Sequence, residues 1–178
     1  MQPDGPLATA LPDAVHAEDL VRTATADVAD IPLALESDPC SPNREEIRQY
    51  FMNVALVLGD SLIAGIDGVR DLQFGVMWRH PNATLMDGPS FDRRFAAAHL
   101  TQAERAALMD RICEAVTLLL KACEPPLVTM STWETDLPAN ARAKFERIAQ
   151  ACAAAGWRTA DAYRDTDGRD HWVFVPSA

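Results

Sequence analysis

The chain has 178 residues, of which 48 % are hydrophobic and 24 % charged, and its net charge is −10. This composition suits one globular domain with extensions, and four Trp, six Phe and two Tyr exclude a wholly disordered chain. No apolar run approaches the roughly 20 residues that span a bilayer. The first 30 residues contain several acidic side chains and no basic head, which excludes a secretory signal peptide. We therefore expect a cytoplasmic protein that does not contact a membrane.

The acidity is concentrated in residues 1–43, which hold eight acidic side chains and one arginine. Six of the twelve prolines also lie there, so the sequence predicts a largely flexible acidic tail, rich in Pro and Ala. Within it, Ala17 to Ala29 is free of proline and places Leu20, Ala24 and Val28 on one helical stripe, which predicts a marginal helix. We expect the folded domain to span residues 44–178.

The predicted domain opens with a helix. Ile47, Tyr50, Phe51, Val54, Ala55 and Leu58 recur at helical spacing, and Gly59 stands where a helix would end. A short buried strand over residues 54–58 is the alternative. The next apolar segments predict a strand over Leu72 to Arg79 and a partner strand over Ala83 to Met86.

The C-terminal half carries clearer signals. Thr101 and Glu104 form a capping box before a helix whose core stripe is Leu108, Ile112, Val116 and Leu119. A strand over residues 127–133 and a helix over residues 138–155 follow. The chain then ends in a hairpin around Asp167-Gly168, whose expected two-residue turn pairs Tyr163 with Trp172, Arg164 with His171, and Asp165 with Asp170. The sequence therefore predicts an α+β fold, with three main helices on a mainly antiparallel sheet of about four to five strands.

One short string suggests catalysis. Val57-Leu58-Gly59-Asp60-Ser61-Leu62 resembles the first block of the GDSL (SGNH) hydrolases, whose serine is the nucleophile. The resemblance implies Ser61 as nucleophile, with His171 as base and Asp167 as its orienting acid. The chain departs from that family because Gly168 stands three residues before His171 and no Gly-x-Asn-Asp block occurs. We favour the interpretation of Gly59-Asp60-Ser61 as a helix C-cap followed by a new N-cap.

Other polar and aromatic side chains are candidates for binding. Trp78, Arg79, His80 and Asn82 form the densest cluster and predict a surface for a small ligand. Trp133 and Trp172 are candidates for an exposed aromatic surface that contacts a protein partner. The cysteines and histidines lack metal-ligand spacing, and no glycine-rich phosphate loop is present, so we expect neither a metal nor a cofactor.

Three functions remain in order of preference. The first is a bacterial interaction or regulatory protein without catalytic activity, which binds a protein through the acidic tail or exposed aromatic residues. Arginine far outnumbers lysine, a bias typical of GC-rich bacterial genomes. The basic side chains of Arg93-Arg94 and of Arg142, Lys144 and Arg147 have acidic neighbours, so a nucleic-acid partner is not expected. The alternatives are a hydrolase using Ser61 and a domain that binds a small ligand around Trp78 to His80.

Overall fold

The computed structural model describes residues 11–37, 47–59, 66–79, 90–91, 95–132 and 134–178. Its strands form one eight-stranded sheet in the order β1-β2-β3-β4-β6-β8-β7, with β5 paired to β4 off this path. Neighbouring strands are antiparallel except β4 and β6, which run parallel. The strands are β1 Leu20–Arg22, β2 Ala26–Ser37, β3 Ile47–Leu58, β4 Arg70–Arg79, β5 Ser90–Phe91, β6 Val128–Ser131, β7 Trp157–Arg164 and β8 Asp170–Pro176.

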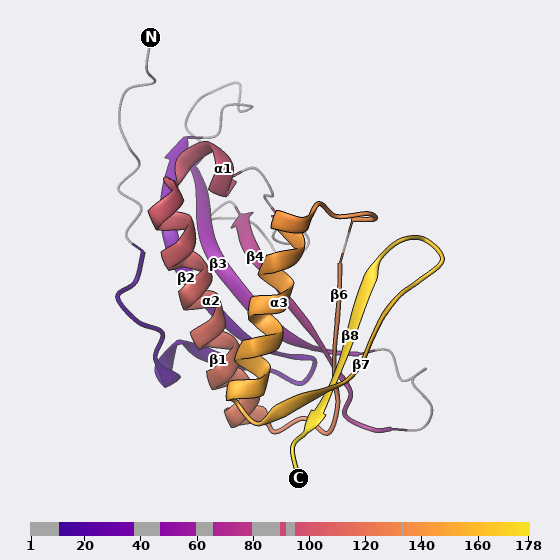
Figure 1. Ribbon diagram of the computed structural model, residues 1–178. Coiled ribbons are helices and arrows are strands. Elements are labelled where there is room, and N and C mark those ends of the chain that lie inside the picture. Colours follow the sequence, from indigo (N-terminus) through magenta and orange to yellow (C-terminus); the bar gives the residue numbers. More distant parts are fainter. Residues whose placement is uncertain (1–10, 38–46, 60–65, 80–89, 92–94, 133) are drawn as a thin grey trace.

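Two long helices cover one face of the sheet, side by side (Figure 1). They are α2, Gln102–Cys123, and α3, Ala139–Ala154, and they are preceded along the chain by the short α1, Phe95–His99, and the 3₁₀ turn η1, Ala17–Asp19. The core lies between this helical layer and the sheet. Alternate residues of the central strands point into it, and among the most buried are Met52, Val54, Leu56, Val128, Met130 and Phe174.

The elements after residue 100 agree with the sequence predictions. Thr101 accepts a hydrogen bond from the Glu104 N–H while its own N–H donates to Glu104 Oε2, so the capping box that begins α2 is confirmed. The predicted core stripe of α2 is buried. The later strand, helix and hairpin are present as β6, α3, β7 and β8. The α+β class with a mainly antiparallel sheet is confirmed, and the sheet has more strands than predicted.

The helix predicted over residues 47–58 is wrong, because this segment is β3. Tyr50, Met52 and Val54 face the helices, while Phe51 and Ala55 on the other face are also buried. A strand buried on both faces carries apolar residues at almost every position, so a helical spacing can be picked out of it. The interpretation of Gly59 as a helix C-cap is therefore also wrong. Gly59 follows β3, and its N–H donates to the Val69 carbonyl, 2.9 Å away.

The N-terminal segment also differs from its prediction. The expected helix over residues 17–29 is replaced by η1, β1 and the start of β2. β2 pairs with β3 along its length, from Ala26 with Val57 to Ser37 with Ile47. Because Ala29, Ile31 and Leu33 of β2 are buried in the core, residues 26–37 belong to the sheet and not to a flexible tail.

The hairpin register is shifted by one residue from the prediction. Tyr163 pairs with His171 and Arg164 with Asp170, instead of Trp172 and His171 respectively. The Asp165 N–H donates to the Arg169 carbonyl and the Gly168 N–H to the Asp165 carbonyl, so three residues form the loop. Gly168 has a φ of +84°, as expected where a type I turn is followed by a left-handed residue. The predicted like-charge pair of Asp165 and Asp170 is therefore absent, since each faces an arginine.

Candidate functional site

A cleft lies where the two parallel strands separate. β4 and β6 are paired only through Arg70 with Val128 and Asp71 with Thr129. Beyond these pairs the strands diverge toward their carboxyl ends, and α2 connects them over one face of the sheet (Figure 1). In open sheets with parallel strands, ligands bind in the crevice outside the carboxyl ends of the strands. This position is therefore the first place to look for a ligand site.

The edge of β4 that faces this cleft presents its backbone. The Arg70 N–H donates to the Leu127 carbonyl, whereas the Val69 carbonyl accepts from Gly59 on the β3 side. Because successive strand residues direct their N–H and C=O groups to opposite neighbours, Phe74 and Val76 direct theirs toward the β6 side, as Arg70 does. Among the described residues, no strand pairs with this edge between Asp71 and Met77. A ligand with amide groups can hydrogen-bond there as an added strand would.

The cleft has a volume of about 580 Å³, within the range of small-molecule sites. It is bounded by β4, α1, α2, the loop after β6, and α3. Phe145 of α3 contacts both β4 and β8, with its ring 5.3 Å from that of Phe74 and 5.5 Å from that of Trp172. The apolar side chains that line the cleft include Phe74, Val76, Leu108, Met109, Ile112 and Phe145.

Basic side chains line the same cleft. Arg147 is paired with Asp110, and Arg105 donates from Nη1 to the Leu100 carbonyl. Neither Arg105 nor Lys144 forms an ion pair with a carboxylate among the described residues. With Arg147 neutralised by Asp110, Arg105 and Lys144 stand against one carboxylate in the lining, Glu134, in a protein whose net charge is −10. The local excess of positive charge favours an anionic ligand.

Both long helices begin beside the basic side chains of the cleft. Gln102 and Arg105 come from the first turn of α2, and Asn140 and Ala141 from that of α3. Pro138, the N-cap of α3, supplies no side-chain hydrogen bond to the first turn. The amino end of a helix carries a partial positive charge, which adds to that of the basic side chains.

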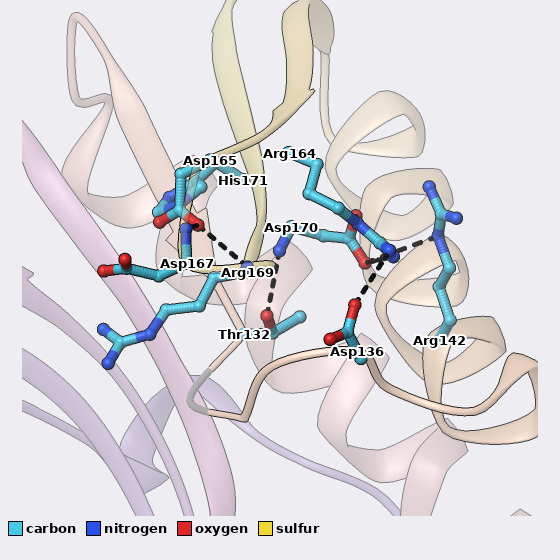
Figure 2. Close-up of polar contacts among 9 residues, drawn as sticks. All are labelled: Thr132, Asp136, Arg142, Arg164, Asp165, Asp167, Arg169, Asp170 and His171. Atoms are coloured by element: carbon cyan, nitrogen blue, oxygen red, sulfur yellow. Dashed lines mark hydrogen bonds and ion pairs between the residues drawn. The ribbon is translucent and has the colours of Figure 1, made fainter.

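A second polar cluster lies at the hairpin tip, where Figure 2 shows Arg164 between Asp170 and Asp136. Asp170 is buried, and it accepts hydrogen bonds from Nε and Nη2 of Arg164. Arg142 of α3 stands 3.7 Å from the same carboxylate, and the Asp170 N–H donates to Thr132 Oγ1. The hydrogen bonds from Arg164 lower the pKa of Asp170, so this carboxylate holds the hairpin, the loop after β6 and α3 together.

His171 connects three elements at this tip. Its Nδ1 lies 2.7 Å from Ser131 Oγ, and its Nε2 lies 2.8 Å from Asp165 Oδ2. The Tyr163 ring stacks on the imidazole, with 5.0 Å between ring centroids. The hydrogen bond from His171 and the N–H groups of Arg169 and Asp167 lower the pKa of Asp165. The result is a serine, a histidine and an aspartate in one hydrogen-bonded chain.

The contacts of His171 differ from those expected for the predicted catalytic set of Ser61, His171 and Asp167. Asp165, and not Asp167, is the carboxylate bonded to His171, because Asp167 lies at the turn with only its N–H directed to Asp165. Ser61 lies outside the described residues, as do His80, Asn82 and Trp133. The partner of His171 on β6 is Ser131, which the sequence analysis did not identify.

The other predicted binding residues have separate surroundings. Trp78 packs against the core, with the Arg48 guanidinium 4.2 Å from its ring centre, and Arg79 lies over the Phe51 ring at 4.7 Å. Trp172 is buried against Phe145, so its prediction as an exposed contact surface is wrong. Trp78 and Arg79 nevertheless lie on β4, the strand that lines the cleft through Phe74 and Val76.

The signals for the two clusters were partly visible in the sequence. Lys144 and Arg147 were recognised as basic neighbours on one helix, but the pattern alone did not place them beside Arg105, about 40 positions earlier. Ser131 carried no local signal at all, because its contact with His171 arises from the β6–β8 pairing of residues 40 positions apart.

Within the described ranges, no group of three or more His, Cys, Asp or Glu side chains is arranged to hold a metal ion. The same ranges contain no helix with the length and apolar content needed to cross a membrane.

No family model matches this sequence, and no curated protein matches it. Two solved structures are similar in part, and both are described as a "putative acetyltransferase". The first, from Sphaerobacter thermophilus, is 11 % identical with a TM-score of 0.37, over 89 % of this chain and 98 % of that one. The second is 12 % identical with a TM-score of 0.30, over 88 % of this chain and 84 % of that one. At these TM-scores we draw no conclusion from either.

Proposed function

We propose that this protein binds an elongated small molecule in the cleft between β4, α2 and α3. The ligand has an anionic group at one end and an extended arm with amide or apolar groups at the other. The single observation that carries the proposal is the cleft itself, in which an apolar floor, basic side chains and a stretch of β4 between Asp71 and Met77 that no described strand pairs occur together. A small-ligand function was one of the alternatives expected from the sequence, there placed around Trp78 to His80.

The arm of the ligand is matched by the floor of the cleft. Phe74 and Phe145 offer aromatic surface, and the backbone of Phe74 offers one N–H donor and one C=O acceptor on the β6 side. An extended arm with an amide group can hydrogen-bond to this backbone and also cover the apolar surface, so one ligand uses both features.

The anionic end is matched by Arg105 and Lys144. They come from the first or second turn of two different helices, so their charges add to the positive ends of both helix dipoles. Phosphorylated compounds with a pantetheine arm, such as coenzyme A, combine a diphosphate with an extended chain of two amides. Coenzyme A is therefore the first probe.

The experiment uses the only two lysines of the chain, Lys121 and Lys144. Both are exposed and both lie on the long helices, but only Lys144 lines the cleft. An amine-reactive ester is applied with and without coenzyme A, and mass spectrometry reports the modification of each lysine. We expect coenzyme A to protect Lys144 while the modification of Lys121 is unchanged.

Calorimetry provides the quantitative test. Reversing the charge with Lys144→Glu should weaken binding of coenzyme A by about tenfold, equivalent to about 1.4 kcal/mol, and Lys121→Glu should leave it unchanged. Pantetheine and inorganic pyrophosphate, tested separately, report on the arm and on the anion. Equal effects of the two lysine variants, or no protection of Lys144, would reject this function.

The protein partner expected from the sequence stays a prediction. Its test cannot be the removal of residues 1–43, because that segment supplies β2 to the sheet. The acidic part is better tested with Asp13→Asn and Glu18→Gln, since both side chains are exposed and Glu18 lies outside the strands. A partner retained by the wild-type protein should be lost by this double variant.

A further inference from the structure

The donor and acceptor in each hydrogen bond among Ser131, His171 and Asp165 can be assigned. Asp165 has a lowered pKa and already accepts the N–H groups of Asp167 and Arg169, so its carboxylate acts as an acceptor. A proton on Nε2 of His171 is therefore the one that satisfies the 2.8 Å contact. In the neutral imidazole, Nδ1 then has its lone pair directed at Ser131 Oγ, which lies 2.7 Å away.

The surroundings limit the access of water to Ser131, His171 and Asp165 but leave room for a small molecule to reach them. The side chains of His171 and Asp165 are 22 % and 29 % exposed, and Ser131 is partly exposed. Tyr163 covers one face of the imidazole. On β6 and β8 the neighbours Met130 and Trp172 point into the core under the helices, so Ser131 and His171 lie on the opposite face of the sheet. This cluster is therefore separate from the lining of the cleft.

We propose that Ser131 is an activated nucleophile, with His171 as its general base and Asp165 as the residue that positions the base. The substrates are small activated carboxylic esters. This inference does not depend on the function proposed for the cleft. It also differs from the hydrolase suggested by the sequence, which used Ser61 and Asp167.

The reaction balances with the groups present and water. Ser131 Oγ attacks the ester carbonyl while its proton moves to His171 Nδ1, and the imidazolium is stabilised by Asp165. The bond to the leaving alcohol breaks, and that alcohol takes the proton from Nδ1. Water then attacks the acyl-serine and gives a proton to Nδ1, which returns it to Ser131 as the carboxylic acid leaves. The base acts through Nδ1 here because Asp165 occupies Nε2.

The test is covalent labelling of the full chain with a fluorophosphonate, followed by peptide mapping. The label should be found on Ser131 of the wild-type protein, a result that requires no variant to fold. Ser131→Ala should abolish the labelling, and Ser177→Ala, at the exposed C-terminus, should leave it unchanged.

Asp165→Asn separates an orienting role from a structural one. The amide can donate to Nε2, which moves the imidazole proton to Nδ1 and removes the base from Ser131. We expect the labelling rate to fall by about 100-fold or more, with an unchanged circular dichroism spectrum. If Asp165→Asn does not fold, the site of labelling in the wild-type protein still decides the proposal. A label on Ser61 or elsewhere, or no label on the folded wild-type protein, overturns the proposal.

Discussion

Arg164 and Asp170 face each other across the C-terminal hairpin and are joined by two hydrogen bonds, of 3.0 Å from Nε and 3.1 Å from Nη2. The carboxylate is 5 % exposed, whereas the arginine side chain is 43 % exposed. The buried member of the pair is thus neutralised by a cation that reaches in from the surface. Because Asp170 also contacts Arg142 on α3, one carboxylate fixes the hairpin against the helical layer (Figure 2).

Replacing this carboxylate should destabilise the fold. Asp170→Asn keeps the shape but removes the charge that Arg164 and Arg142 share, and we expect a loss of about 1.5 to 3 kcal/mol in the free energy of unfolding. The matched control is Asp136→Asn, which removes another partner of Arg164 whose side chain is 78 % exposed. It should cost less than about 1 kcal/mol. Urea denaturation measures both, and equal losses would contradict the role of burial.

Stability should fall in acid because the folded state lowers the pKa of Asp165 and of Asp170. The unfolded chain then binds more protons than the native one between the two pKa values of each group. Their contribution is therefore complete above the unfolded value, about 3.9, and is lost as the pH falls through the folded value. We expect a loss of stability below about pH 4 in urea titrations.

The double variant Asp165→Asn, Asp170→Asn should be less stable at pH 7. Its free energy of unfolding should also fall less steeply below about pH 4, the part of the curve called here the acid limb. Asp161→Asn, which changes an exposed aspartate of the same hairpin, should leave the acid limb unchanged. An acid limb in the double variant as steep as in the wild-type protein would show that other carboxylates govern the acid response.

The C-terminal half of the fold was predictable because its signals are local. The capping box of Thr101 and Glu104, and the helical stripe from Leu108 to Leu119, depend on residues only a few positions apart. The hairpin was also recognised, but its register was not. A two-residue turn and a three-residue turn with a left-handed glycine both place Gly168 at the tip, and the difference shifts every pair by one residue.

The N-terminal half was not predictable because tertiary burial overrides its local pattern. β3 lies in the middle of the sheet, with Met52 buried against the helices and Phe51 buried on the opposite face. In β2, Asp27 and Asp30 resemble a solvated tail, but Asp27 is paired with Arg22 and Asp30 accepts a hydrogen bond from Asn53. Such partners lie on other strands, so composition alone assigned this segment to a flexible tail.

The place of β2 in the core is testable by a single substitution. Leu33 is 3 % exposed, so Leu33→Ala should lower the free energy of unfolding by about 2 to 4 kcal/mol. The control is Val21→Ala on β1, where the side chain is 57 % exposed and the expected loss is about 0.5 kcal/mol or less. Urea denaturation distinguishes the two. A flexible N-terminal segment predicts no loss from either variant.

Cys152 should report the opening of the core. It is fully buried on α3, and burial raises the pKa of its thiol to about 12. Since the thiolate is the reactive form, burial slows modification twice, by raising the pKa of the thiol and by keeping reagent away from it. In native protein, iodoacetamide should therefore modify Cys152 at least about 1,000-fold more slowly than in urea-unfolded protein, as followed by peptide mass spectrometry.

Cys123 is the internal comparison, because burial raises its pKa to about 11 and its side chain is partly exposed. The rate at Cys152 should rise with urea in parallel with global unfolding, because α3 packs on α2 and the sheet together. Rapid modification of Cys152 without denaturant would instead require α3 to detach from the folded protein.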